Sequence, residues 1–174
     1  MNSLKNKMKK LLTRLPAAMM YFGRPHSVMI ETNNNCNLKC ELCPLGRMTR
    51  PIGKMTMEQF RLLVDDLTGF TPKLLLWNYG EPFLHPEIFD MVSYAKERGF
   101  HVVLSTNSTR LGPEYRKGVF ESGLDELIVC LDGFSKESQE SYRRGSDFNQ
   151  IKNDIEALCR EKRDEARPTP FIRL

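Results

Sequence analysis

Short apolar runs and amphipathic segments alternate along this chain of 174 residues, and the alternation limits the folds that the chain can form. The apolar runs predict strands at residues 27–32, 73–79, 101–106, 126–133 and 169–174. The segments between them have apolar residues at helical spacing. They predict helices at residues 56–67, 86–99 and 113–123, with one or two more within 135–166. Because continuous apolar strands between helices form parallel sheets, we expect an α/β fold with helices on at least one face.

The ends of the predicted helices carry favourable start and stop residues. Thr56 is the expected N-cap of the first helix, while Pro86 opens the second and Gly99 closes it. Right-handed crossovers bring the carboxyl ends of all strands to one edge of the sheet, where folds of this kind have their active sites. The loops that follow the strands are therefore the first place to look for functional residues.

Composition fits one soluble globular domain, since the chain is 40% hydrophobic and 28% charged. No apolar run reaches the ~18 residues of a membrane span. Residues 1–25 carry six basic and no acidic side chains, which leaves 20 basic against 22 acidic residues elsewhere. We expect this basic arm to pack on the fold or to contact an anionic membrane or a protein partner weakly, and we expect no nucleic-acid substrate. A signal peptide is a third reading, although Arg14 interrupts its apolar stretch.

Three of the five cysteines lie within eight residues, in "TNNNCNLKCELCPLG" after the first predicted strand. This odd, clustered set favours a metal and a reducing cytoplasm over a disulfide scaffold. Four cysteines satisfy every iron of a cubane iron–sulfur cluster, whereas three leave one iron without a protein ligand. An open coordination position is what a catalytic metal site needs. Cys36, Cys40 and Cys43 are therefore candidate ligands of a catalytic iron–sulfur cluster.

The alternative is a zinc site made by the three cysteines and one histidine. His26, His85 and His101 are the candidate fourth ligands. Zinc sites of this kind usually pair two knuckles of two cysteines each, and the present spacing has a different rhythm. The spacing favours iron–sulfur, and both readings stay open at this point.

The CxxxCxxC spacing after a first strand resembles the signature of the radical S-adenosylmethionine (radical SAM) enzymes. The resemblance implies a partial TIM-like barrel of parallel strands, a [4Fe–4S] cluster on the three cysteines, and SAM bound to the open iron through its amino nitrogen and carboxylate. It also implies that one electron cleaves SAM to methionine and a 5′-deoxyadenosyl radical, which takes hydrogen from a substrate. The electron would come from a reductant such as flavodoxin or ferredoxin, in the cytoplasm.

Motifs after the second and third predicted strands fit the same family. "NYGEP" places Gly80 and Glu81 where the family has a Gly-Gly-Glu motif that contacts the SAM amino group, and "GEPFLHP" resembles the branch that often carries a SPASM-type extension. Gly80 would let the backbone approach the ligand, and Glu81 would accept hydrogen bonds from the amine. In "STNS", Thr106 and Asn107 match a Thr-Asn-Gly stretch that lines the SAM site, while Ser108 replaces a glycine suited to positive φ.

The motifs after the fourth predicted strand match less closely. "VCLDG" keeps Asp132 and the next glycine of the family's Ser-x-Asp-Gly, but Cys130 stands at the serine that often contacts SAM. A thiol is a weak hydrogen-bond donor, so that contact would be weakened or lost. Cys130 could instead be a small buried side chain, or donate a hydrogen atom to a radical. In "SYRRGSDF", Arg143 is the expected partner of the SAM carboxylate, with Arg144 as the alternative.

Two more residues stand apart from the family pattern. Leu42 precedes the third cysteine, where many radical SAM proteins have an aromatic residue near the adenine. Leucine can pack against that ring but cannot stack on it. Cys159 matches no motif and is expected to be an inert helix thiol.

Residues 26–174 are expected to form an incomplete radical SAM core. The sequence predicts four strand–helix units and one further strand, fewer than the family's barrel generally has, so the barrel would be truncated after the fifth strand. The expected function is radical SAM catalysis on a peptide, a protein or a small molecule. The alternative is a non-catalytic remnant or assembly module that holds iron–sulfur or zinc.

Overall fold

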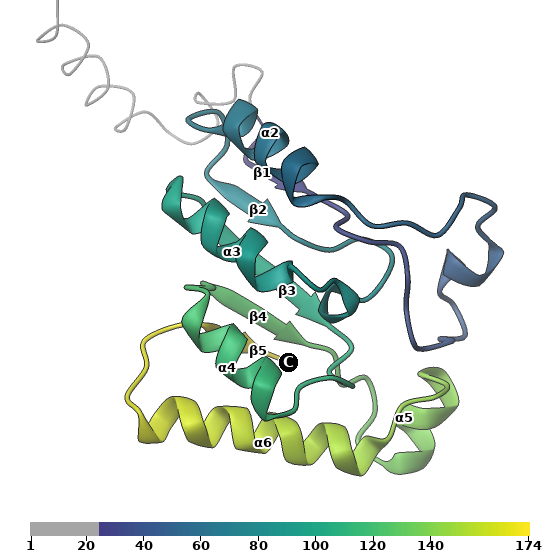
Figure 1. Cartoon of the computed structure of the whole chain (residues 1–174). Coiled ribbons are helices and arrows are strands. Elements are labelled where there is room, and N and C mark those ends of the chain that lie inside the picture. Colours follow the sequence, from purple (N-terminus) through teal and green to yellow (C-terminus); the bar gives the residue numbers. More distant parts are fainter. Residues whose placement is uncertain (1–24) are drawn as a thin grey trace, which may run out of the picture.

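The sheet has five parallel strands in the order β1-β2-β3-β4-β5, which confirms the predicted α/β fold. The structure is a computed structural model and describes residues 25–174 (Figure 1). The predicted basic arm, residues 1–25, lies outside the described residues except for Pro25. The strands are β1 (Ser27–Met29), β2 (Lys73–Leu75), β3 (His101–Thr106), β4 (Glu126–Val129) and β5 (Phe171–Arg173).

Several strands are shorter than predicted, because the chain leaves the sheet before its apolar run ends. β2 was expected to reach residue 79, but it ends at Leu75. One more ladder bond follows each of the first two strands: Ile30 N donates to Leu75 O at 2.8 Å, and Leu76 N donates to Val103 O at 2.9 Å. Beyond these bonds the chain turns into the loops at the carboxyl edge.

Five α-helices and two 3₁₀ turns connect the strands within the described residues. They are η2 (Pro44–Arg47), α2 (Met57–Leu67), η3 (Pro82–Leu84), α3 (Ile88–Glu97), α4 (Pro113–Glu121), α5 (Lys136–Tyr142) and α6 (Phe148–Asp164). Thr56 caps α2 as predicted, since its Oγ1 accepts from Gln59 N at 3.2 Å and its N–H donates to Gln59 Oε1 at 2.9 Å. None of these helices has the length and apolar character that a membrane span requires.

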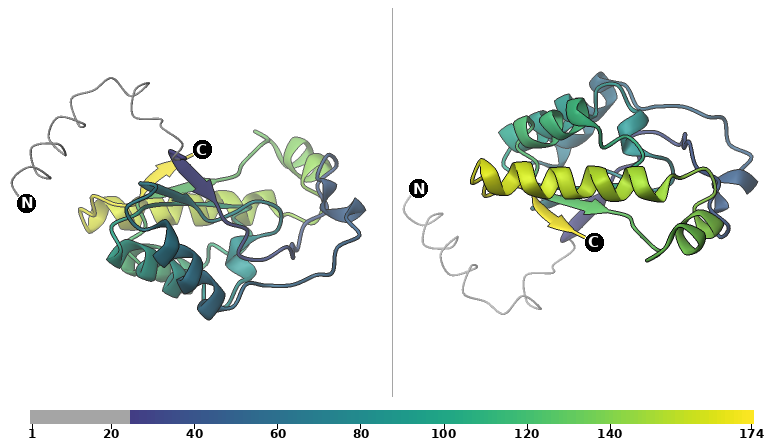
Figure 2. Two further views of the ribbon diagram at one scale, coloured as in Figure 1. Left: turned by 90° about the horizontal axis from the view of Figure 1, so that it is seen from above. Right: turned by 90° about the horizontal axis from the view of Figure 1, so that it is seen from below.

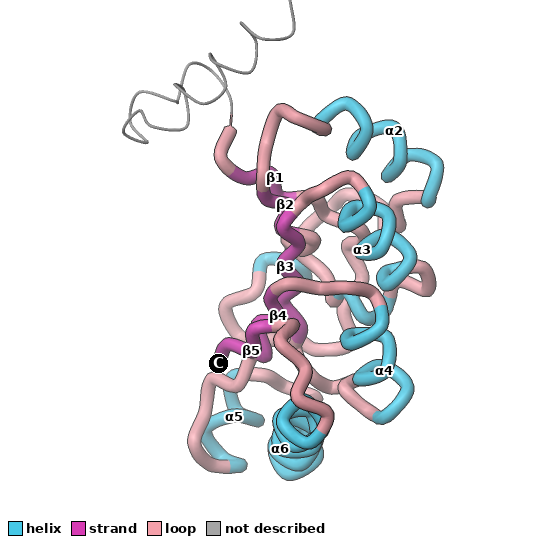
Figure 3. The backbone as a smooth tube through the Cα atoms, turned by 90° about the vertical axis from the view of Figure 1, so that its left-hand side faces the viewer, coloured by secondary structure: helices cyan, strands magenta, loops and turns pink. Residues whose placement is uncertain are grey.

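The helices α2, α3 and α4 cover one face of the sheet, and α6 lies beyond α4 (Figure 3). Side chains on this face form the core: Leu74, Val102, Leu104, Leu127 and Val129 are each 0% exposed. Among the described residues, β1 and β5 each have a single strand neighbour, so the sheet is an open arc. This agrees with the partial TIM-like barrel expected from the sequence.

Candidate active site

The loops that follow β1, β2, β3 and β4 enclose a cavity of about 160 Å³ at the carboxyl ends of the strands. Its wall includes most of the residues singled out in the sequence: Cys36, Cys40, Cys43, Gly80, Glu81, Thr106, Asn107, Cys130 and Arg143. The parallel topology therefore brings motifs from separate loops to one place.

A second cavity, of about 480 Å³, lies along the same cysteine-bearing segment. Cys36, Cys40 and Cys43 line both cavities and so belong to the wall that they share. The rest of the second wall is partly apolar and includes Leu38, Leu45, Met48 and Ile52.

The donor set fits a [4Fe–4S] cluster. All five cysteines lie in the described part of the chain and are free thiols. Within the described residues, no three His, Cys, Asp or Glu side chains converge closely enough to hold a single metal ion. A cubane makes no such demand, because its thiolates bind different irons and need only surround the cluster. Cys36, Cys40 and Cys43 surround space of this kind.

None of the three histidines, all of which the structure describes, lines a cavity with the cysteines. His85 is 2% exposed, and its two ring nitrogens lie 2.8 and 3.1 Å from backbone groups. His101 begins β3 at the opposite end of the strands, where its Nε2 lies 2.7 Å from Glu126 Oε1. His26 directly precedes β1 at that same end. The structure thus brings no histidine to the three thiols.

The cysteine loop, residues 34–53, is closed at its base. Asn34 N donates to Gly53 O at 3.2 Å, and Gly53 N donates to Asn34 Oδ1 at 2.7 Å. Asn34 Nδ2 also donates to Pro51 O at 2.8 Å. We call these contacts the neck, because they tie the two ends of the loop together before it carries the cysteines outward.

Gly80 and Glu81 fasten the loop after β2 to the start of the cysteine loop. Gly80 has a φ of +101°, and a Cβ atom there would lie 2.4 Å from Asn33 O, so only glycine fits. Glu81 N donates to Asn35 O at 2.7 Å, and Asn33 Nδ2 donates to Glu81 O at 3.0 Å. The close backbone approach expected of Gly80 is therefore made to the protein itself.

The Glu81 carboxylate joins the loop after β2 to the end of β3. It is 2% exposed; Oε1 accepts from Phe83 N at 3.0 Å and from Thr106 Oγ1 at 2.7 Å, and Oε2 accepts from Asn107 N at 2.7 Å. Burial raises the pKa of Glu81 above its ordinary value, although the three hydrogen bonds act in the opposite direction. The sequence predicted that Glu81 would contact the SAM amino group, and it did not predict these hydrogen bonds within the protein.

Asn107 lies beside the first cysteine. Its Nδ2 is 3.6 Å from Cys36 Sγ, and it donates to Asn37 Oδ1 at 3.0 Å. Leu38 N also donates to Cys36 Sγ, at 3.4 Å. Burial raises the pKa of the Cys36 thiol, while the two N–H donors favour its thiolate form. A residue expected at the SAM site is therefore in contact with a candidate cluster ligand.

Ser108 adopts the positive-φ turn, although a serine stands here where the family usually has glycine. It is fully buried and adopts a φ of +64°. Its N–H donates to Thr106 Oγ1 at 3.1 Å, and its hydroxyl donates to Thr106 O at 3.4 Å. These local bonds offset part of the strain of a left-handed conformation.

Arg143, rather than Arg144, faces the cavity. Arg143 pairs with Asp132 and its side chain is 15% exposed, whereas Arg144 is 63% exposed and pairs with Glu41. Burial raises the pKa of the Cys40 thiol, and the Arg143 guanidinium lowers it. The guanidinium therefore stands close enough to Cys40 to influence its charge.

Cys130 reaches the cavity, as its strand-end position led us to expect. Its Sγ lies 3.3 Å from Ser105 Oγ. Leu42 does not reach it: this side chain is 78% exposed and lines neither cysteine-lined cavity. Cys159 is exposed on α6 and also lies outside both cavities.

Sequence reasoning missed part of the cavity wall. The missed residues are Leu45, Trp77, Asn78, Tyr79 and Ser105. Trp77, Asn78 and Tyr79 were assigned to the last residues of the second predicted strand, because the apolar run appeared continuous through residue 79. The signal that could have found them is position alone, since they directly precede Gly80 at the carboxyl end of a parallel strand.

This fold and this cavity define an α/β protein of the partial TIM-barrel class with a three-thiol site at the carboxyl edge of its sheet. The sequence profile described as "Radical SAM superfamily" matches residues 30–167, so the chain belongs to the radical SAM superfamily. The members of this superfamily are enzymes that bind a [4Fe–4S] cluster and SAM. The resemblance seen in the sequence motifs is thereby confirmed.

Curated relatives agree with this membership. An AdoMet-dependent heme synthase of Methanosarcina barkeri is 31% identical over 121 residues, which cover 68% of this chain and 34% of the relative. An Fe-coproporphyrin III synthase of the same organism is 30% identical over 133 residues, covering 75% and 33%. A mycofactocin maturase of Mycobacterium ulcerans is 27% identical over 129 residues, covering 74% and 35%. The chain thus spans about a third of the length of these relatives.

Solved structures share the fold. The enzyme anSMEcpe with bound AdoMet superposes with a TM-score of 0.66 at 23% identity, over 80% of this chain and 41% of that one. Streptococcus suis SuiB bound to its precursor peptide SuiA superposes with a TM-score of 0.65 at 14% identity, over 78% and 30%. Both likenesses concern the arrangement of strands and helices.

Proposed function

We propose that residues 26–174 are the catalytic core of a radical SAM enzyme. Cys36, Cys40 and Cys43 would hold the [4Fe–4S] cluster. SAM would bind against the residues at the neighbouring strand ends: Gly80, Glu81, Thr106, Asn107, Asp132 and Arg143. When bound, the cluster and SAM supply a 5′-deoxyadenosyl radical that takes a hydrogen atom from a peptide, a protein or a small molecule.

The single observation that carries this proposal is the cavity of about 160 Å³, which the three cysteines line together with residues of three other loops. Three thiols from one loop line it together with polar residues from the loops after β2, β3 and β4. A structural metal site is closed by its protein ligands, whereas a catalytic one keeps room for a further ligand. The cavity beside the cysteines provides this room, and the polar side chains in its wall, such as Asn107 and Arg143, are donors that could hold a charged ligand.

The contacts suggest a task for each group of residues. Asn107 Nδ2 and Leu38 N point donors at Cys36 Sγ, which stabilises a thiolate there. Arg143 offers a planar guanidinium suited to a carboxylate, and its pairing with Asp132 orients it. Glu81 ties the loop after β2 to the end of β3, so that the groups on both loops hold a fixed spacing.

The partners follow from the chemistry. The one-electron reductant would be a carrier such as flavodoxin or ferredoxin, and the compartment the cytoplasm. The relatives' names refer to heme synthesis and to mycofactocin maturation, and one structural neighbour binds a precursor peptide. They support radical chemistry on either a peptide or a small molecule.

Anaerobic reconstitution with iron and sulfide tests the proposal. We expect a brown protein that forms 5′-deoxyadenosine when dithionite and SAM are added. The matched control is Cys159→Ala, which should behave like the wild type because Cys159 lies on α6 outside both cavities. A colourless protein loaded with zinc would overturn the proposal.

A second candidate function is a non-catalytic module that holds a metal. It is supported by Cys130 in place of a serine expected to contact SAM, and by the Glu81 carboxylate, whose two oxygens already accept three hydrogen bonds within the protein. A protein that assembles the cluster, but neither binds SAM nor forms 5′-deoxyadenosine with dithionite, would favour this candidate.

A further inference from the structure

The short helix α5 contacts two loops of the candidate site at once. Figure 2 shows it beside the cysteine loop in both views, next to the loop that follows β4. From its sequence motif, we expected one task of this stretch, a ligand contact by Arg143. The backbone contacts of α5 indicate another.

Gln139 grips the loop after β4. It is 0% exposed, and its Oε1 accepts from Asp132 N at 2.9 Å and from Gly133 N at 3.0 Å. Its Nε2 has no partner among the described residues, so the oxygen alone orients the amide. A Cβ atom at Gly133 would lie 2.4 Å from Gln139 N, so this loop rests directly on the backbone of α5.

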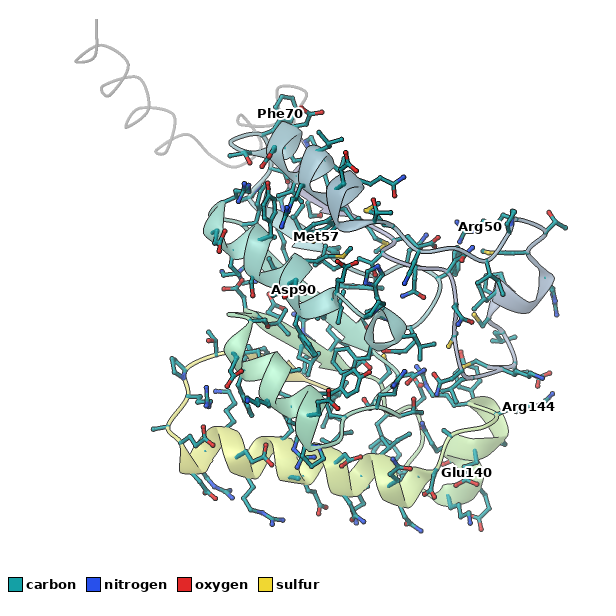
Figure 4. All side chains as sticks on the ribbon, viewed as in Figure 1. Arg50, Met57, Phe70, Asp90, Glu140 and Arg144 are labelled. Atoms are coloured by element: carbon teal, nitrogen blue, oxygen red, sulfur yellow. The ribbon has the colours of Figure 1, made fainter. Side chains whose placement is uncertain are left out.

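The other end of α5 grips the cysteine loop on both sides of Cys40. Lys39 N donates to Arg144 O at 3.0 Å, and Glu41 N donates to Tyr142 O at 3.1 Å. The ion pair between Arg144 and Glu41 reinforces this contact, and Figure 4 places Arg144 where α5 faces the loop. Cys40 is therefore held between two backbone hydrogen bonds.

We propose that Gln139 is a positioning residue and that α5 acts as a bracket between the two loops. The bracket fixes Cys40 relative to Arg143 and Asp132. The seven-residue helix α5 and the residues at its C-terminal end contact the loop after β4 on one side and the residues next to Cys40 on the other. The inference rests on the proposed function: a ligand held by Arg143 would be coupled through α5 to the iron bound by Cys40. No other link of this directness joins the β4 loop to the cysteine loop among the contacts of the described residues.

Two substitutions at Gln139 test the bracket. Gln139→Leu removes the accepting oxygen, whereas Gln139→Glu keeps one. The control is Gln59→Leu, which removes a glutamine oxygen that accepts from the Thr56 backbone N–H at the start of α2, outside both cysteine-lined cavities. Each reconstituted protein is examined for iron content, thermal stability, SAM affinity, and the EPR spectrum of the reduced cluster with and without SAM.

We expect Gln139→Leu to keep its iron but to bind SAM about tenfold more weakly, with a smaller SAM-induced change in the EPR spectrum. Gln139→Glu should keep the wild-type SAM affinity and the wild-type change in the EPR spectrum. Gln59→Leu should lose thermal stability while its affinity and spectrum stay those of the wild type. If Gln139 had a purely structural role, Gln139→Leu would behave like Gln59→Leu: it would lose thermal stability and keep the wild-type SAM affinity and EPR spectrum.

Wild-type SAM affinity and an unchanged EPR response in Gln139→Leu would overturn the bracket and leave the proposed function standing. A wild-type protein whose cluster does not respond to SAM would overturn the proposed function, and the bracket with it. If Gln139→Leu does not fold, Gln139→Asn carries the same test, because its shorter side chain withdraws the oxygen from the two N–H groups.

Discussion

The two ends of the parallel strands are held together by different interactions. At the carboxyl ends, the loops are joined chiefly by hydrogen bonds, such as those that Glu81 accepts from Thr106 and Asn107. At the amino ends of β2, β3 and β4, polar and charged side chains meet across the sheet: Glu126 bonds to Lys73 Nζ at 3.0 Å and to His101 Nε2 at 2.7 Å. Arg173, the last residue of β5, also pairs with Glu126. Glu126 thus links β4 to side chains of β2, β3 and β5, outside the loops that line the cysteine cavity.

The pKa values of the partly buried Glu126 and the buried Glu81 are shifted in opposite directions. Hydrogen bonds from Lys73 and His101 lower the pKa of Glu126 from its ordinary 4.5 to about 2, whereas burial raises the pKa of Glu81. Stabilisation by Glu126 is therefore present above about pH 4.5 and is lost as the pH falls toward 2. The contribution of Glu81 has the other sign and decreases as the pH rises through its folded-state pKa.

The largest effect is expected from the cysteines, and it should appear at the carboxyl end alone. Cys36→Ala, Cys40→Ala and Cys43→Ala should each lose the visible absorbance of the reconstituted cluster, since each removes one of three ligands. The described fold should persist in all three, by circular dichroism. A full cluster in any one of them would remove that cysteine from the ligand set.

Glu81→Ala should affect both stability and ligand binding. Loss of three hydrogen bonds to a buried carboxylate should lower the free energy of unfolding by about 3 kcal/mol, measured by urea titration. The protein should retain its cluster and bind SAM more weakly, measured by equilibrium titration. Unchanged SAM affinity would exclude Glu81 from the SAM site, and unchanged stability would contradict its joining of β2 to β3.

Glu126→Gln should affect stability but not the site. Removing the carboxylate charge that faces the cations Lys73 and Arg173 should cost about 1–2 kcal/mol at neutral pH, and the acid sensitivity between pH 4.5 and about 2 should become less steep. Cluster loading and SAM affinity should remain those of the wild type. The control is Glu121→Gln, which breaks an exposed pair with Lys117 and should cost less than about 0.5 kcal/mol. Loss of the cluster in Glu126→Gln would show that the two ends are not independent.

The smallest effect is expected at Ser108. Ser108→Gly should raise the free energy of unfolding by about 0.5 kcal/mol, because glycine adopts a φ of +64° without strain. Ser122→Gly, at a φ of −71°, should instead lower it. Destabilisation of Ser108→Gly would mean that the hydroxyl bond to Thr106 O outweighs the backbone strain.

The sequence predicted the fold better than the strand boundaries. Helical spacing located the helices closely, and Thr56 is the N-cap that its position indicated. Pro86 does not open the second helix as expected, because α3 begins at Ile88 with Glu87 as its N-cap. The second strand was predicted to extend to residue 79 because apolar residues continue past Leu75, where β2 ends. An apolar run indicates that residues are buried, but it does not show whether they lie in a strand. Apolar residues beyond the end of β2, such as Trp77 and Tyr79, line the cavity from a loop.

Within the site, side chains at strand ends were predictable and their partners were not. Position after a parallel strand was enough to bring Asn107 and Cys130 to the cavity. The contact of Asn107 with Cys36 depends on how two loops pack. The grip of α5 on the cysteine loop consists of backbone bonds from Lys39 and Glu41, which leave no side-chain signature.

The neck makes the cysteine loop tolerant of length changes. Asn34 and Gly53 stay joined whatever the outer part of the loop does, so residues added or removed near the exposed Gly46 would not displace β1 or α2. A protease that cut at Gly46 would likewise leave two fragments pinned to each other at the base, and the nicked chain would migrate as one species until it was denatured.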